Sequence, residues 1–110
     1  MRGAAIIFIG MMLWAQQSVA QDRARPAGEF ERLLNKDAAS VMEILGLPVQ
    51  DAQDGPARRL QFAGPACILD VYLYPPEDGA EPRVTYAAAR VADGREADRN
   101  LCITILRLQR

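Results

Sequence analysis

The sequence predicts a single α+β domain, with one or two N-terminal helices packed on a three-stranded antiparallel sheet and a helix at the C-terminus. Three observations support this fold class. The chain has 110 residues, which suffices for one small domain. Residues 38–45 place apolar side chains at the spacing of a helix, and residues 66–74 alternate like a strand with one buried face.

The composition excludes several function classes. Apolar residues make up 50% of the chain and charged residues 25%, which is typical of a folded protein. With 13 basic and 14 acidic residues the net charge is −1, so no positive field is available for a nucleic-acid partner. The chain has no histidine, which excludes histidine-based triads and most catalytic zinc sites. We therefore expect no nucleic-acid partner, no metal site and no cofactor.

Residues 1–20 have the three parts of a secretory signal peptide. Arg2 gives a positive start, 3–15 is an uncharged apolar run, and small residues follow, so we expect cleavage between Ala20 and Gln21. The alternative is a permanent anchor, but the run is shorter than the roughly 20 residues that span a bilayer. No cysteine stands directly after the apolar run to accept a lipid. We therefore expect a periplasmic or secreted protein without a lipid attachment or a stable membrane anchor.

The helical part of the domain precedes the strands. Residues 21–28 are polar with Pro26 and Gly28 and predict a flexible lead, so the domain is expected over residues 29–110. Three apolar residues at helical spacing then predict a short turn or helix: Phe30, Leu33 and Leu34.

The clearest helix covers residues 38–45. We expect Asp37 to be the N-cap of this helix, whose apolar stripe runs from Ala38 to Leu45. Gly46 suits a left-handed C-terminal residue, and Pro48 prevents the helix from continuing.

Three strands are expected after this helix. Residues 49–57 are acidic and rich in turn residues, which predicts a surface connection. A short strand follows over 59–63, and the most regular alternation covers 66–74, with Cys67, Leu69, Val71 and Leu73 on one face. Residues 83–91 resume the β pattern after a polar connection and should pair antiparallel with that strand.

The C-terminal segment, residues 98–110, fits two structures. Asp98 could cap a helix whose apolar face is formed by Leu101, Cys102, Ile105 and Leu108, and we favour this interpretation. The β-branched residues 103–105 keep a strand open as the alternative.

Cys67 and Cys102 are the only cysteines. Both follow the leader, and exported proteins meet an oxidising compartment, so we expect a disulfide between them. The chain-entropy model assigns such a bridge about 3–4 kcal/mol of stabilisation. No CxxC motif is present to indicate a redox centre. An intermolecular bridge or free thiols remain the alternatives.

The second face of the predicted 66–74 strand is the candidate partner-binding face. It carries Ile68, Asp70, Tyr72 and Tyr74. An exposed aromatic face would suit a protein partner, and the alternative is that a helix covers it. We expect Asp70 to be half-exposed and paired with Arg83 or Arg59 of neighbouring strands, rather than to act as a catalytic acid or base.

Part of the chain resembles a known family. Residues 45–48 read Leu-Gly-Leu-Pro, and the strand segments 59–62 and 67–75 follow. This layout resembles small exported proteins of alphaproteobacteria and the SmpA/OmlA (BamE-like) envelope domain, over residues 30–91. The resemblance implies a helix before a three-stranded sheet and a role in outer-membrane assembly or envelope integrity. The chain lacks the acylated cysteine of the lipoprotein members.

These observations predict a non-catalytic binding or accessory protein of the cell envelope, acting through a sheet face or edge on a protein partner. The alternative is an inhibitor that docks on a secreted or periplasmic enzyme, a role that a related fold has in β-lactamase inhibitors. A hydrolase that uses Asp70 ranks behind both.

Overall fold

The computed structural model describes residues 28–110. The predicted signal peptide, its cleavage site between Ala20 and Gln21, and residues 21–27 of the predicted lead lie outside the described residues.

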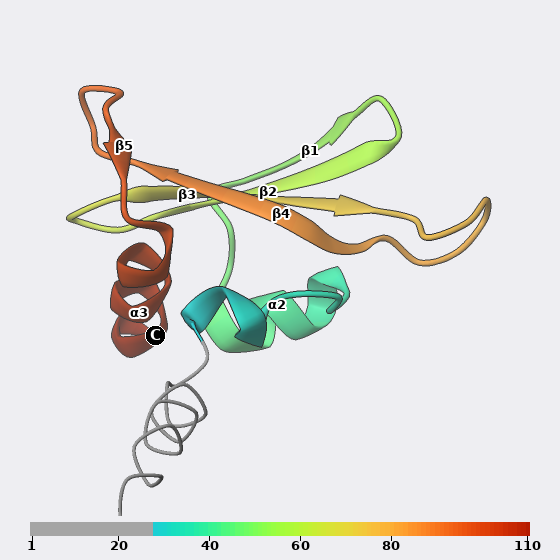
Figure 1. Ribbon diagram of the computed structural model, residues 1–110, viewed down its shortest axis with the longest axis horizontal. Coiled ribbons are helices and arrows are strands. Elements are labelled where there is room, and N and C mark those ends of the chain that lie inside the picture. The colour runs from blue at the N-terminus through green and yellow to red at the C-terminus, as the bar shows by residue number, and fades with distance from the viewer. Residues whose placement is uncertain (1–27) are drawn as a thin grey trace, which may run out of the picture.

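The described chain forms two layers, an antiparallel sheet and a set of helices that all lie on one side of it (Figure 1). The elements are η2 (Glu29–Arg32), α2 (Ala38–Leu45), β1 (Gln50–Asp54), β2 (Ala57–Ala63), β3 (Ile68–Tyr74), β4 (Arg83–Arg90), β5 (Glu96–Ala97) and α3 (Arg99–Gln109). The α+β class is therefore confirmed. The sheet has five strands in the order β1-β2-β3-β4-β5, and the prediction of three was wrong.

Strand β1 lies in the segment that was expected to be a surface connection. Its sequence, Gln-Asp-Ala-Gln-Asp, carries no apolar alternation, and none of its residues is buried. It is a strand because a tight turn at Gly55, with φ 63°, folds it back along β2, so that Asp54 pairs with Ala57. Strand β5 has two residues, which is too short for a periodic signal.

Helix α2 has the predicted limits. The Asp37 side chain accepts a hydrogen bond of 2.9 Å from the Ser40 N–H at its start. At its end Gly46 has φ 92°, a conformation that L side chains rarely adopt. Before it, η2 is a single 3₁₀ turn that buries Phe30.

The C-terminal segment is the helix α3, and Asp98 caps it by accepting from the Leu101 N–H at 3.1 Å. The prediction of its buried face was correct for Cys102 and wrong for Leu101 and Leu108, and Ile105 is half-buried. Cys102, Ile103 and Leu106 are buried, whereas Leu101 is 58% exposed and Leu108 70% exposed. Both stripes have helical spacing, so packing against the sheet and η2 had to select one.

The core lies between the helices and the inner face of the sheet. The predicted inner residues of β3, Leu69, Val71 and Leu73, are fully buried. They meet side chains from both layers: Phe30, Leu33, Val41, Leu45, Leu60, Phe62, Val84, Cys102, Ile103 and Leu106.

The disulfide between Cys67 and Cys102 is present, with the two Cα atoms 5.9 Å apart. Cys67 directly precedes β3 and Cys102 lies in the first turns of α3, so the bridge fastens the last helix to the sheet. Neither cysteine is free in the described chain. The bridge holds together two elements that are distant in sequence.

Candidate protein-binding face

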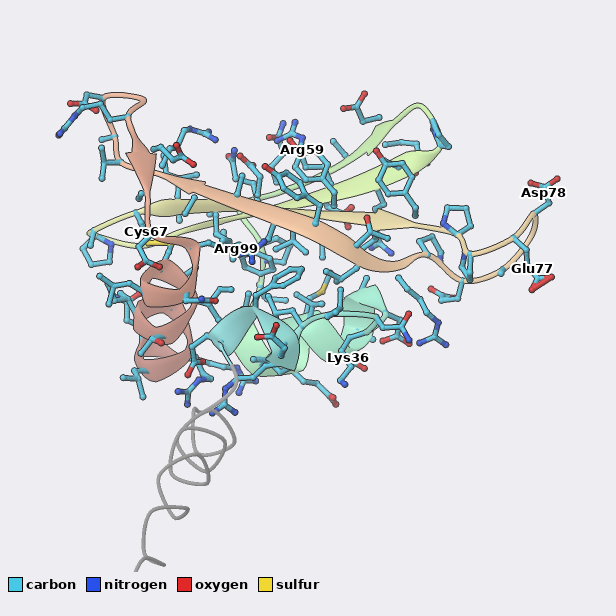
Figure 2. All side chains as sticks on the ribbon, in the orientation of Figure 1. Lys36, Arg59, Cys67, Glu77, Asp78 and Arg99 are labelled. Carbon is cyan, nitrogen blue, oxygen red and sulfur yellow. A yellow bond between two sulfur atoms is a disulfide. The ribbon has the colours of Figure 1, made fainter. Side chains whose placement is uncertain are left out.

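The sheet face opposite the helices is uncovered within residues 28–110 (Figure 1). Figure 2 shows Arg59 on this side, pointing away from the helices, whereas Arg99 points into the space between the sheet and the helices. We call this surface the outer face. Its central residues come from three strands: Arg59, Gln61, Ile68, Asp70, Tyr72, Tyr74, Tyr86, Ala88 and Arg90.

Asp70 is more buried than the sequence predicts. It is 6% exposed, although no described helix covers it. Its Oδ1 accepts from Gln61 Nε2 at 2.9 Å and from Arg59 Nη1 at 3.3 Å. Its Oδ2 accepts from Arg90 Nη1. The carboxylate is therefore shielded by its own hydrogen-bond donors. We call these four residues the Asp70 cluster.

The strand register explains these partners. Gln61 lies directly opposite Asp70, and Arg59 lies opposite the next residue on the same face, Tyr72. Arg90 lies opposite Ile68, one step in the other direction. Such direct and diagonal neighbours across a sheet are within reach of long side chains.

Of the two alternative partners predicted for Asp70, Arg59 forms the ion pair and Arg83 does not. The guanidinium of Arg83 donates instead to the backbone oxygen of Asn35 at 3.0 Å. Arg83 pairs with Tyr74, beyond an irregularity in the β3–β4 ladder, and is therefore at the far end of the strand. The sequence did not predict Arg90 as a partner of Asp70, because only the strand register shows that the two side chains lie on the same face of the sheet.

The Asp70 cluster suits positioning rather than proton transfer. Both carboxylate oxygens are occupied by donors of the same chain. An ionised carboxylate accepts several hydrogen bonds, and two guanidiniums satisfy its charge. The arrangement therefore holds Arg59 and Arg90 in fixed positions over the sheet.

Tyr72 and Tyr86 form the aromatic part of the outer face. They are direct cross-strand neighbours, and their ring centroids are 5.8 Å apart. Tyr86 is 53% exposed. The sequence pattern placed Tyr86 in a strand but did not show that it joins the predicted face. Tyr74, at the end of β3, is exposed, and Ile68 is half-buried.

The free edge of β1 is acidic. Asp51 accepts two hydrogen bonds from Arg58 of β2, at 3.0 Å and 2.7 Å. This interaction lowers the pKa of the Asp51 carboxyl and raises the pKa of the Arg58 guanidinium. Charged, exposed side chains on an edge strand oppose pairing with another chain. The outer face is therefore a better candidate for binding than this edge.

A hollow of about 500 Å³ lies among the helices, lined by Arg32, Glu43, Ile44, Arg107 and Arg110. Glu29 bridges Arg32 and Arg107, with N···O distances of 2.9 Å and 3.2 Å. Burial raises the pKa of the Glu29 carboxyl, but its hydrogen bonds and ion pairs with Arg107 and Arg32 outweigh burial and lower it. Both arginines lie in the last turns of their helices, where cations offset the helix dipole. The ion pairs with Glu29 and the helix dipole therefore account for Arg32 and Arg107 without a bound ligand.

Within the described part of the chain, no three acidic or cysteine side chains gather in a way that could hold a metal ion. None of the helices in residues 28–110 has both the length and the apolar character needed to span a bilayer.

Comparisons with known proteins add no relative. No family model, no curated protein and no solved structure matches this chain. The resemblance to the SmpA/OmlA domain therefore stays a prediction. A function can be inferred only from the residues of the outer face.

Proposed function

We propose that this protein is a non-catalytic binding module of the bacterial envelope and that it binds a protein partner through the outer face. The observation that carries the proposal is the uncovered centre of the sheet, where the Tyr72–Tyr86 pair lies beside the Asp70 cluster.

The residue types on this face favour protein binding. Tyrosine and arginine are enriched in protein interfaces and provide many of the residues whose truncation weakens binding most. Here they stand on neighbouring strands of one sheet, and the Asp70 cluster restrains both arginines. A preorganised surface loses less conformational entropy on binding than a flexible one.

The proposed compartment depends on the predicted leader and on the disulfide. Disulfides persist in the periplasm and outside the cell and are rare in the cytosol. Envelope or outer-membrane maintenance is the role that the family resemblance implies. The fold alone does not select this role over enzyme inhibition.

Site-specific photo-crosslinking in intact cells tests the proposal. A photoreactive amino acid replaces Tyr86 on the outer face or, as the matched control, Glu43, which is exposed on α2. We expect a discrete crosslinked protein from position 86 and none from position 43. No crosslink from position 86, or the same crosslinks from both positions, would overturn the proposal.

The same experiment distinguishes the accessory role from inhibition. The crosslinked partner is identified by mass spectrometry and purified. If it is an enzyme whose activity falls in proportion to the bound protein, the binding module is an inhibitor. A structural component of the envelope supports the accessory role.

A further inference from the structure

The Asp70 cluster points to the chemistry of the partner. We propose that the partner segment carries an acidic side chain next to an aromatic one, and that its carboxylate binds between Arg59 and Arg90 while the aromatic ring packs on Tyr72 and Tyr86. This inference rests on the proposed function and names the class of partner that the outer face fits.

The guanidiniums of the Asp70 cluster lie farther out from the sheet than its carboxylate. The side chain of Asp70 is 8% exposed, against 24% for Arg59 and 40% for Arg90. A partner therefore meets the guanidiniums before the carboxylate. Within the Asp70 cluster itself, two positive charges stand against one negative charge, while the exposed carboxylate of Glu96, opposite Arg90, lies outside the cluster.

The two guanidiniums have hydrogen-bond donors that Asp70 does not use. A guanidinium has five N–H groups, and only one nitrogen each of Arg59 and Arg90 contacts Asp70. Glu96 lies opposite Arg90 in the β4–β5 ladder but forms no ion pair with it. Donors of both arginines thus remain for a carboxylate of the partner.

The two guanidiniums are also preorganised. An arginine side chain loses rotamer entropy when it is fixed, and Asp70 already restrains both guanidiniums in the unbound protein. Binding of a carboxylate therefore costs less side-chain entropy here than it would at two unrestrained surface arginines.

The aromatic pair lies at the Arg59 end of the Asp70 cluster. Tyr72 lies opposite Arg59 on one side and opposite Tyr86 on the other. The tyrosine pair is therefore a direct neighbour of Arg59, whereas Arg90 lies opposite Ile68, at the other end of the cluster. An aromatic ring of the partner can stack against these rings with its edge or its offset face.

A peptide selection tests the inference. Random dodecapeptides are displayed and selected for binding to the disulfide-bonded protein, to the Arg59→Gln/Asp70→Asn/Arg90→Gln variant, and to Arg32→Gln as the control. The triple variant removes all three charges. Asn keeps the size of Asp70, and Gln is a shorter neutral polar side chain in place of each arginine. Arg32 lies in η2, in the helical layer, and its variant also removes one positive charge.

We expect the wild-type protein and the control to enrich peptides with an acid adjacent to an aromatic residue. The triple variant should bind these peptides at least about tenfold more weakly, the loss expected for one charge-assisted hydrogen-bonded pair. Replacing the acid of the peptide by its amide should have a similar effect. If the triple variant does not fold, Arg90→Gln, which keeps the Arg59–Asp70 pair, takes its place.

Other results would overturn the inference. These are enrichment of neutral or basic peptides, no enrichment, or equal binding to the wild-type protein and the triple variant. A discrete crosslink from position 86 together with such a result would overturn only the acidic partner and leave the proposed function standing. The absence of that crosslink would overturn the proposed function itself.

Discussion

The carboxylate of Asp70 in β3 and the guanidinium of Arg90 in β4 form an ion pair on the side of the sheet that faces away from the helices. Asp70 owes its low exposure to side chains of its own sheet, because no described helix lies over it. The outer face is thus organised by interactions within the sheet.

Substituting Asp70 by alanine should destabilise the fold. The change removes the acceptor of three side chains and leaves two guanidiniums in mutual repulsion. Because both arginines are partly exposed, we expect a loss of about 1–3 kcal/mol in the free energy of unfolding rather than the full cost of a buried charge. Urea denaturation measures it. A wild-type midpoint would show that the Asp70 cluster contributes nothing to stability.

Reducing the disulfide should lower the free energy of unfolding by about 3 kcal/mol, since the bridge closes a long loop between Cys67 and Cys102. Urea unfolding of the wild-type protein with and without reductant measures this change, and the Cys67→Ser/Cys102→Ser variant should match the reduced form. Alkylation of the unreduced protein should label neither cysteine. Two labelled thiols would contradict the bridge.

The two stripes of α3 should respond differently to truncation. Ile103→Ala opens a cavity in the core and should cost about 2–5 kcal/mol. Leu108→Ala removes an exposed side chain and should change stability by less than about 0.5 kcal/mol. Thermal or urea unfolding of the two variants compares them. A larger loss for Leu108→Ala than for Ile103→Ala would mean that the helix is rotated to the face expected from the sequence.

Acid should destabilise the fold through surface carboxylates. Their hydrogen-bond donors lower the pKa values of Asp37, Asp51 and Asp93 in the folded state. A carboxyl whose folded pKa lies below its unfolded value contributes stability above the unfolded pKa and loses it as the pH falls.

We therefore expect the urea midpoint to decline as the pH falls below about 4, the ordinary range of aspartate. Asp51→Asn should reduce the slope of this decline, because it removes the carboxyl that Arg58 binds. A pH profile identical to that of the wild-type protein would show that the Asp51–Arg58 pair does not contribute.

The elements whose signals lie within a short window could be predicted from the amino-acid sequence. Helix α2 could be predicted with its limits because the N-cap Asp37, the apolar stripe and Gly46 are all local features. Strand β3 followed from its strict alternation. The disulfide could be predicted because only two cysteines are present.

How these elements pack against one another could not be predicted, because it depends on the folded arrangement. Strand β1 forms because it pairs with β2. Packing against the sheet and η2 determines which of the two apolar stripes of α3 is buried. The β3–β4 register brings Arg90 next to Asp70. Each of these outcomes depends on contacts between residues far apart in the chain. Local propensity and periodicity do not contain that information, since one pattern fits several registers and rotations with nearly equal local energy.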